Sequence, residues 1–468
     1  MYAVLYDDQE LIISNNKVSM SKSILVDYEE FDETHIPWIY DFKHIHNIEV
    51  VRILNQIKVS DMNMWFYEFK NLRELIDFQN LDTSTCENFS KMFFGCESLE
   101  TLAELQNLNV ANGIDFSNMF RSCRSLKNLN GLQGWNVHSA TTFSEMFLDC
   151  VNLTSLVELQ NWNVSNCENF CCMFDGCVSL LDISVLQNWN VSNCKDFSGM
   201  FSGCILLQTI DALKNWNVKN EINFLGMVEY CTSLGDISAL QNWNLSNGKN
   251  FSRMFYCCTS LQDISVLQDW NVENGEDFSN MFYSCKLLQD ISALKNWNVK
   301  NGINFSDMFS GCISLQDISA LQNWNVENGE DFSAMFFYCE LLQDISALAH
   351  WDVSNGTDFS WIFNSCKSLQ DIRALQNWNV ENGIEFSFMF AECNSLQNIH
   401  ALENWDVSNG TDFSSMFANC KLLKDISLQN TLKYLSKGMF YECNSNLKIH
   451  WKNHTYTYED LLEYEKLF

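Results

Sequence analysis

The stretch Phe305–Asp331 reads FSDMFSGCISLQDISALQNWNVENGED, and its pattern returns every 27 residues along most of the chain. The Phe that opens it recurs thirteen times, from Phe89 to Phe413, with no change in spacing. A Cys follows each of these Phe residues seven positions later, and a Trp recurs in phase from Trp135 to Trp405. A fixed period of this length, with the same residue types at the same phases, is typical of a solenoid.

Within one coil the apolar residues occupy fixed positions. Those of Phe305–Cys312 have the i, i+3, i+4 and i+7 spacing of one helix face, and an acidic or Asn residue precedes the Phe as a suitable N-cap, so we expect a short helix. The segment 316–319, Gln-Asp-Ile-Ser, is expected to form β-bridges to adjacent coils about 4.8 Å away. Pairs such as Asn328-Gly329 predict turns. Nine side chains of the coil should point inward: Phe305, Met308, Phe309, Cys312, Leu315, Ile318, Leu321, Trp324 and Val326.

The repeated string F-S-x-M-F-x-x-C-x-S-L-x-D-I-S-x-L-x-x-W-N-V resembles the BspA-like leucine-rich repeat, in the variant found in mycoplasma surface proteins as a domain of unknown function. Its hallmark M-F-x-x-C-x-S-L stands at Met308–Leu315 and at Met389–Leu396. The resemblance implies a right-handed solenoid that binds proteins or surfaces and has no catalytic residues. The predicted fold class is therefore an α/β repeat, a right-handed leucine-rich-repeat-like solenoid of 27-residue coils, each with a short helix and a short strand.

The chain divides into three predicted parts. Residues 1–61 do not follow the period and are expected to cap the first coil, because a solenoid exposes an apolar surface at each end. The solenoid itself spans residues 62–447. Residues 448–468 are expected to form an acidic capping tail.

The two terminal parts contain their own predicted elements. In the first, Tyr2–Ile13 indicates a strand and His46–Ile57 a short helix. In the tail, a short amphipathic helix would bury Leu461, Leu462 and Leu467 against the final coil. The alternative for the tail is a docking helix for another chain.

Charge limits the kinds of partner. The chain has 59 acidic and 28 basic residues, a formal net charge of −31. Such a surface excludes nucleic-acid binding through phosphate neutralisation, and it disfavours an anionic membrane surface. It favours a basic protein partner, or it serves only to keep the molecule soluble. No run of 18 apolar residues predicts a membrane span, and the oligomeric state stays open.

Twenty cysteines raise the question of disulfides or metal. Fourteen of them occupy the repeat slot, which indicates a small buried position suited to a free thiol. The first residues, MYAVLYDDQELIIS, lack a basic segment followed by an apolar run, so we expect an intracellular, reducing location, with surface exposure as the alternative. Cys167 and Cys194 share a turn phase and could touch. Cys167, Cys171, Cys172 and Cys177 have neither a C-x-x-C pair nor a matching His, which argues against zinc.

An Asp stands before the Ile slot in coil after coil. The structural interpretation is a hydrogen bond from a nearby backbone N–H to each carboxylate, and the functional one is an acidic stripe that faces a basic ligand. A calcium ladder fits less well, because the bidentate Glu of known loops is missing. Asn residues on both sides of the Trp predict amide ladders between coils, with glycan recognition as the alternative. The candidate stripe consists of Asp182, Asp236, Asp263, Asp290, Asp317, Asp344, Asp371 and Asp425.

No phosphate loop, nucleophile elbow or isolated acid–base pair interrupts the period, so we expect no catalytic residue, cofactor or metal site. The sequence predicts a non-catalytic repeat scaffold that mediates protein–protein interaction through an extended acidic surface. Two alternatives are a surface adhesin or virulence-type protein and a structural component of a larger assembly.

Overall fold

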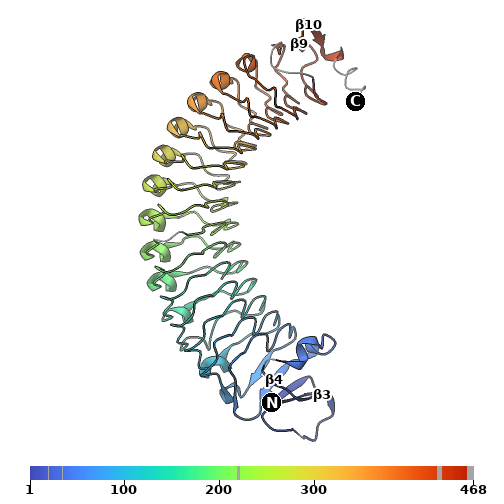
Figure 1. The fold of residues 1–468 in the computed structure, drawn as a ribbon, viewed down its shortest axis with the longest axis vertical. Coiled ribbons are helices and arrows are strands. Elements are labelled where there is room, and N and C mark those ends of the chain that lie inside the picture. The colour runs from blue at the N-terminus through green and yellow to red at the C-terminus, as the bar shows by residue number, and fades with distance from the viewer. Residues whose placement is uncertain (19, 34, 219–221, 429–434, 461–468) are drawn as a thin grey trace. The chain divides into compact units, whose positions relative to one another are not determined.

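The computed structural model describes residues 1–468 except 19, 34, 219–221, 429–434 and 461–468. The chain divides into two compact units, one of Met1–Ile222 with Tyr230–Thr232 and one of Asn223–Glu229 with Ser233–Phe468. Within each unit successive coils stack on one another, as Figure 1 shows. The predicted repeat solenoid is therefore confirmed, whereas the positions of the helix and the strand within each coil are corrected below.

The segment Phe305–Cys312 forms consecutive turns rather than the expected helix. The N–H of Met308 donates to the carbonyl of Phe305 at 3.3 Å. The third residues of successive turns, Asp307 and Gly311, have left-handed φ values of 55° and 72°. The helix prediction was wrong because apolar residues at i, i+3, i+4 and i+7 also face one way in a run of four-residue turns.

This turn segment, which we call the turn edge, joins each coil to the next. The N–H of Asp307 donates to the carbonyl of Ser333 at 2.8 Å, and that of Phe309 donates to Met335 at 2.9 Å. Left-handed φ values cost non-glycine residues about 1–2 kcal/mol each, and these inter-coil hydrogen bonds offset that cost. Each coil thus presents N–H donors to the coil that follows it.

Most regular coils contain a short 3₁₀ helix at the segment equivalent to Ser-Ala-Leu-Gln-Asn, whereas the coil that opens at Phe116 has turns there. In Ser319–Asn323, Ala320 and Leu321 are buried, and the helix ends where the N–H of Trp324 donates to the carbonyl of Leu321 at 3.1 Å. These helices appear as coiled ribbons along one side of each unit in Figure 1. Their bounds are η4 (Ala103–Asn107), η5 (Val157–Leu159), η6 (Ser184–Asn188), η7 (Asp211–Asn215), η8 (Ser238–Asn242), η9 (Ser265–Asp269), η10 (Ser292–Asn296), η11 (Ser319–Asn323), η12 (Ser346–His350), η13 (Arg373–Asn377) and η14 (His400–Leu402).

Most β-bridges of the regular coils lie just before the Phe, and at the predicted Gln-Asp-Ile-Ser segment bridges form at Thr209 and Asp236 of two adjacent coils. Asn304, for example, pairs in parallel with Asp331, and Asp331 pairs with Asp358. The predicted segment pairs as strands near the two chain termini. There β4 (Val50–Ile53) pairs with β6 (Glu74–Ile76), and β8 (Asp425–Ser427) pairs with β9 (Lys448–Trp451). In the coils between that carry the Asp, its carboxylate accepts the N–H of the residue two positions later, as Asp317 does from Ser319, and the chain turns into the 3₁₀ helix.

The core consists of side-chain ladders, and all nine predicted inward residues are buried. The rings of Phe305 and Phe332 stack with centroids 5.6 Å apart, and those of Trp324 and Trp351 stack at 6.4 Å. Trp324 also donates its indole N–H to the carbonyl of Leu294 in the preceding coil at 2.9 Å, and the same bond recurs in other coils, for example from Trp351 to Leu321 at 3.0 Å. The interpretation of the Trp as core is confirmed.

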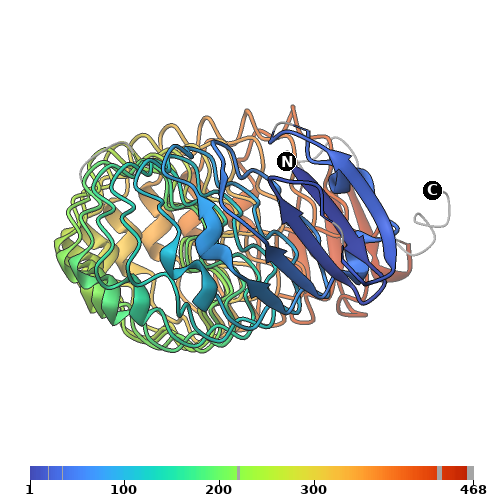
Figure 2. The same cartoon turned by 90° about the horizontal axis from the view of Figure 1, so that it is seen from below.

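The N-terminal residues form a sheet instead of the predicted strand and helix. Tyr2–Ile13 is a hairpin of β1 (Tyr2–Tyr6) and β2 (Glu10–Ser14), because the chain turns at Gln9 with φ of 67°. The helix prediction for His46–Ile57 was wrong, because β4 lies within that range. The sheet order is β3-β1-β2-β4-β6, and its strands lie side by side in dark and medium blue in Figure 2. The remaining elements are β3 (Ile24–Glu30), β5 (Ile57–Lys58), β7 (Leu81–Asp82), η1 (Pro37–Tyr40), η2 (Ile45–Asn47) and η3 (Phe78–Asn80).

This N-terminal part covers the first coil. Trp38 is fully buried, and its ring packs edge-on against that of Trp65 with centroids 6.3 Å apart. Its indole Nε1–H donates to the carbonyl of Trp65 at 2.5 Å. In later coils the equivalent carbonyl accepts a backbone N–H from the preceding coil, so at this coil Trp38 supplies the donor instead.

The C-terminal coil ends in a three-stranded sheet in the order β10-β9-β8, with β10 at His454–Thr457. At the start of a helix, the N–H of Thr457 donates to the carboxylate of Asp460 and the N–H of Asp460 donates to the hydroxyl of Thr457, in the manner of a capping box. The hydroxyl of Tyr458 accepts the N–H of Glu442 at 3.1 Å. The predicted lid residues Leu461, Leu462 and Leu467 lie outside the described residues. The boundaries at 61/62 and 447/448 stay predictions.

Candidate functional site

The aspartates of the acidic stripe lie in successive coils, each just before the 3₁₀ helix of its own coil. The predicted backbone hydrogen bonds form at every stripe residue whose side chain is described: Ser319 N–H donates to Asp317 at 2.7 Å, and Ser265 N–H donates to Asp263 at 2.8 Å. The side chain of Asp425 lies outside the described set. Each carboxylate thus has a fixed place on its coil, and its binding role stays a prediction. Equivalent bonds hold Asp182, Asp236, Asp290, Asp344 and Asp371.

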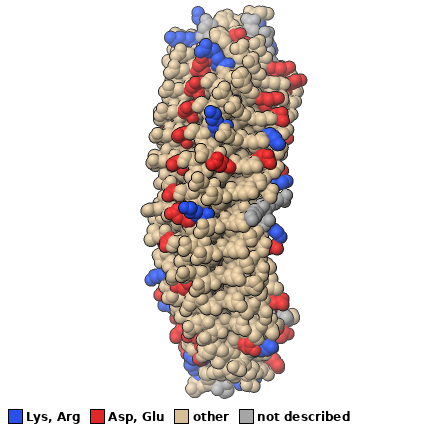
Figure 3. All heavy atoms as spheres, turned by 90° about the vertical axis from the view of Figure 1, so that its left-hand side faces the viewer, with Lys and Arg blue, Asp and Glu red and all other residues tan. Residues whose placement is uncertain are grey.

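Four consecutive stripe carboxylates of the second unit are exposed to solvent. Among the described residues, no Lys or Arg lies within ion-pair distance of Asp263, Asp290, Asp317 or Asp344. The N–H and hydroxyl of Ser265 hold the pKa of Asp263 below its usual value, so that carboxylate stays charged at neutral pH. Figure 3 shows rows of acidic side chains on the face that it views.

In the coil after Asp344, the stripe aspartate has a basic neighbour. Arg373 takes the position that Ser occupies in the coils before it, and its guanidinium pairs with Asp371 at 2.5 Å. The negative charge of Asp371 is therefore partly neutralised. The stretch with unpaired carboxylates ends at Asp344.

Shallow hollows lie between adjacent coils along this stripe. One is lined by Gln262, Asp263, Ser265, Asp290 and Ser292, and has a volume of about 250 Å³. These side chains offer carboxylate, amide and hydroxyl groups to a ligand that crosses the coils. In the part of the chain that the structure describes, no three His, Cys, Asp or Glu side chains come together as metal ligands would.

The amide ladder forms, but from a different asparagine than predicted. Asn325, which follows the Trp, accepts the N–H of Glu327 at 3.1 Å within its own coil. The inter-coil bond comes from Asn328 of the Asn-Gly pair, whose Nδ2 donates to the carbonyl of Lys300 at 2.7 Å. The short reach of Asn325 to a backbone N–H two residues ahead explains why it stays within its coil.

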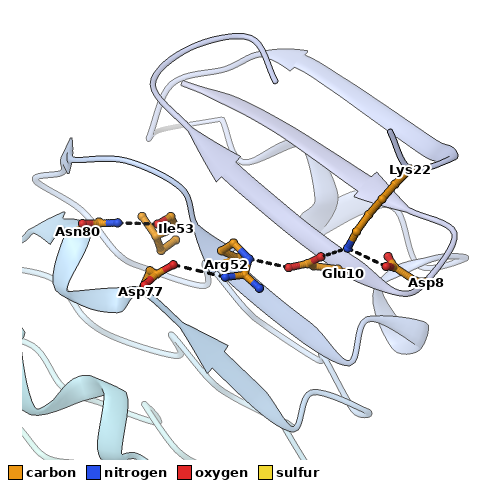
Figure 4. Close-up of polar contacts among 7 residues, drawn as sticks. All are labelled: Asp8, Glu10, Lys22, Arg52, Ile53, Asp77 and Asn80. Atoms are coloured by element: carbon orange, nitrogen blue, oxygen red, sulfur yellow. Dashed lines mark hydrogen bonds and ion pairs between the residues drawn. The ribbon is translucent and has the colours of Figure 1, made fainter. Parts of the chain in front are cut away.

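A polar cluster in the N-terminal sheet, shown in Figure 4, has no sequence pattern that predicts it. Glu10 is 6% exposed and accepts hydrogen bonds from Lys22 and from Arg52, whose Nε lies 2.7 Å away. Arg52 also reaches Asp77 at 3.4 Å. Burial opposes the charge of Glu10, but Lys22 and Arg52 together hold its pKa below the usual value. The cluster links β2, β4 and the first coil, and we interpret it as structural.

The family model described as "Mycoplasma protein of unknown function, DUF285" matches overlapping segments of the chain. The matched residues are 39–158, 126–204, 144–266, 181–294, 262–371 and 341–451. The chain belongs to this family. The predicted resemblance to the mycoplasma variant of the BspA-like repeat is thereby confirmed for this DUF285 protein. No curated protein sequence matches it.

Three solved structures are similar to this DUF285 protein. A leucine-rich repeat protein from Bacteroides ovatus is 16% identical, with 96% of this chain and 98% of that chain covered and a TM-score of 0.42. A leucine-rich repeat protein from Eubacterium ventriosum is 14% identical, with coverage of 85% and 93% and a TM-score of 0.33. A leucine-rich cell surface protein from Faecalibacterium prausnitzii is 13% identical, with coverage of 98% and 95% and a TM-score of 0.28.

No helix among the described residues combines the length and the apolar character that a membrane crossing needs.

Proposed function

We propose that this protein is a non-catalytic scaffold that binds a basic protein segment along Asp263, Asp290, Asp317 and Asp344. The supporting observation is that these four carboxylates are exposed, held in place by their own turns and, among the described residues, without a cationic partner. Binding then orders few acidic side chains, because the turns have already fixed them, and this lowers the entropic cost of association. A basic segment that lies across successive coils meets one carboxylate per coil.

The test uses the full chain and a short lysine-rich peptide. Changing the four aspartates to Asn removes four charges and keeps an acceptor for each turn N–H. The matched control changes Glu273, Glu327, Glu330 and Glu381 to Gln, which removes the same charge from another part of the same unit.

The two variants should differ in affinity. We expect the Asn variant to bind the peptide at least tenfold more weakly and the Gln variant to bind it nearly as well as the unchanged protein. The affinity of the unchanged protein should fall as salt approaches 1 M, where the screening length is about 3 Å. An equal loss in both variants would show that only overall charge attracts the peptide, and it would overturn the stripe proposal.

We further propose an intracellular location. All twenty cysteines are free thiols, and three of them, Cys171, Cys172 and Cys257, are partly exposed. Exposed free thiols are usual in reducing compartments. A membrane-impermeant maleimide applied to intact cells that make the protein should label these cysteines only after lysis. Labelling before lysis would instead place the protein at the surface, as the adhesin alternative requires.

A further inference from the structure

Cys171 and Cys172 differ from the cysteines of the repeat slot. They lie on the turn edge of the coil that opens at Phe170, and their Sγ atoms are 3.6 Å apart. Both are partly exposed, as Cys257 is, whereas the remaining cysteines are buried. The chain therefore presents two adjacent thiols to solvent at one point.

Local structure leaves room for this pair. Cys172 is the third residue of its turn, with φ of 52°. The next coil has Gly199 at the equivalent position, and a Cβ there would lie 2.8 Å from the Sγ of Cys172. The absence of that side chain keeps the space beside the sulfur open.

The two thiols differ in acidity. The hydrogen bond between them lowers the pKa of Cys171 to about 7, against the effect of its partial burial, and raises that of Cys172. Burial raises the pKa of Cys257. The thiolate is the nucleophile in thiol–disulfide exchange. The turn therefore holds a nucleophile, Cys171, next to a second thiol, Cys172, that can attack in a second step.

We propose that Cys171 and Cys172 form a site of reversible thiol–disulfide exchange with low-molecular-weight disulfides. The Cys171 thiolate attacks one sulfur of the disulfide, forms a mixed disulfide and releases the other half as a thiolate. Cys172 then gives its proton to solvent and attacks the Cys171 sulfur, which closes an intramolecular disulfide and releases the second half. Two electrons pass from the pair to the small disulfide.

The oxidised pair should be easy to reduce again. Adjacent Cα atoms lie about 3.8 Å apart, closer than the roughly 4.4–6.8 Å usual for bridged cysteines. A ring closed between neighbouring residues is therefore strained, and strained disulfides react readily with reducing thiols. The exchange requires no bound partner at the acidic stripe, so it is independent of the proposed scaffold function.

The probe is the aromatic disulfide 5,5′-dithiobis(2-nitrobenzoate), whose released thiolate is coloured. The full chain carries Cys257→Ser, which removes the other partly exposed thiol. At pH 7 we expect two coloured thiolates per chain in a fast phase and a product that has lost two hydrogens without gaining an adduct. Dithiothreitol should restore the starting mass.

Single variants separate the steps. Adding Cys172→Ser should stop the reaction at one coloured thiolate and leave a stable adduct on Cys171. Adding Cys171→Ser should remove the fast phase. In the otherwise unchanged chain, Cys171 should react several-fold faster than Cys257. A stable adduct on both cysteines, or a Cys171 rate no higher than that of Cys257, would overturn the proposal.

Discussion

At the scale of single residues, the repeat slot uses cysteine as a small apolar residue that still makes a hydrogen bond. Cys312 is fully buried, and its thiol donates to the carbonyl of Phe282 in the preceding coil at 3.2 Å. Burial raises the pKa of Cys312 to about 12, so the group stays a neutral thiol. The same bond recurs from coil to coil, for example from Cys339 to Phe309 at 3.2 Å.

Replacing Cys312 by Ser should lower the free energy of unfolding by about 1–2 kcal/mol. The hydroxyl keeps an acceptor in Phe282, but it is more polar than a thiol and its shorter bond to Cβ loosens the packing. Denaturant unfolding measures the change. The matched control is Cys257→Ser, since Ser284 occupies the same position with φ of 54° in the next coil. Equal stability of both variants would contradict a core role for the slot.

Asp331 is a carboxylate whose charged form the fold disfavours. It bonds the N–H of Ser333 at 2.9 Å, and Asn304 makes the same bond to Ser306 in the preceding coil. Burial raises the pKa of Asp331, and the neighbouring Asp358 adds to the shift. The folded state therefore binds this proton more tightly than the unfolded state, and ionisation of Asp331 destabilises the fold.

Changing Asp331 to Asn should stabilise the protein at neutral pH by about 0.2–1 kcal/mol, the range for like charges on neighbouring strands. The gain should shrink as pH falls through the raised folded pKa, and it should vanish below the unfolded pKa of about 4, where Asp331 is neutral in both states. Thermal unfolding at several pH values measures this. The exposed Asp290→Asn is the control and should change stability little. A gain that persists in acid would rule out the charge as its cause.

At the scale of the coil element, the Phe ring adapts to the residue three positions before it. A Cβ on Gly329 would lie 2.4 Å from the ring of Phe332. Phe332 lies 6.1 Å from Trp351 at an interplanar angle of 39°. Where Ala140 replaces the Gly, the ring of Phe143 lies 5.3 Å from Trp162 at 30°. The ring thus moves toward the Trp when a Cβ takes the space.

Gly329→Ala should therefore cost only about 1 kcal/mol, at the low end of the range for overpacked cores, because the Phe332 ring can take the position seen at Phe143. Denaturant unfolding gives the cost, and a changed Trp351 fluorescence spectrum should report the ring shift. Ala140→Gly is the reverse control, with little loss expected. A cost of several kcal/mol would mean that the Phe332 ring cannot take the position seen at Phe143.

Periodicity and composition predicted the repeat, its inward residues and the bonds of the stripe aspartates, because these depend on spacing and on short-range chemistry. They misplaced the helix at Phe305–Cys312, since a run of four-residue turns gives the same apolar spacing. The choice between the two depends on inter-coil N–H bonds, such as that of Asp307, which no single coil reveals. The pairing of Glu10 with Arg52, 42 residues away, depends on the sheet order and left no local pattern.

At the scale of the whole molecule, the hydrogen bonds described above make each regular coil an exchangeable layer. The coil 305–331 receives bonds from the coil before it and gives the same bonds to the coil after it. Stability in such a stack is close to a sum over coils and their interfaces. Removing one layer should leave two surfaces that still match.

Deleting residues 305–331 should give a shorter protein that folds cooperatively, because Phe332 then follows Asn304 in the register that Phe305 had. Deleting 305–317 instead removes half a coil and should abolish cooperative unfolding, since donors and acceptors no longer face each other. Circular dichroism with thermal unfolding distinguishes the two outcomes. A full-coil deletion that fails to fold would contradict nearest-neighbour stacking.

The inter-coil bonds also have a direction. Every turn edge offers N–H groups forward and carbonyls backward, so the first and last surfaces of the stack are unlike and complementary. An uncapped chain could accept a second copy head to tail, and repeated addition of this kind would have no closing step. The indole N–H of Trp38 donates to one backward-facing carbonyl, and the hydroxyl of Tyr458 accepts one forward-facing N–H. We therefore expect these two side chains to oppose the head-to-tail addition of further copies.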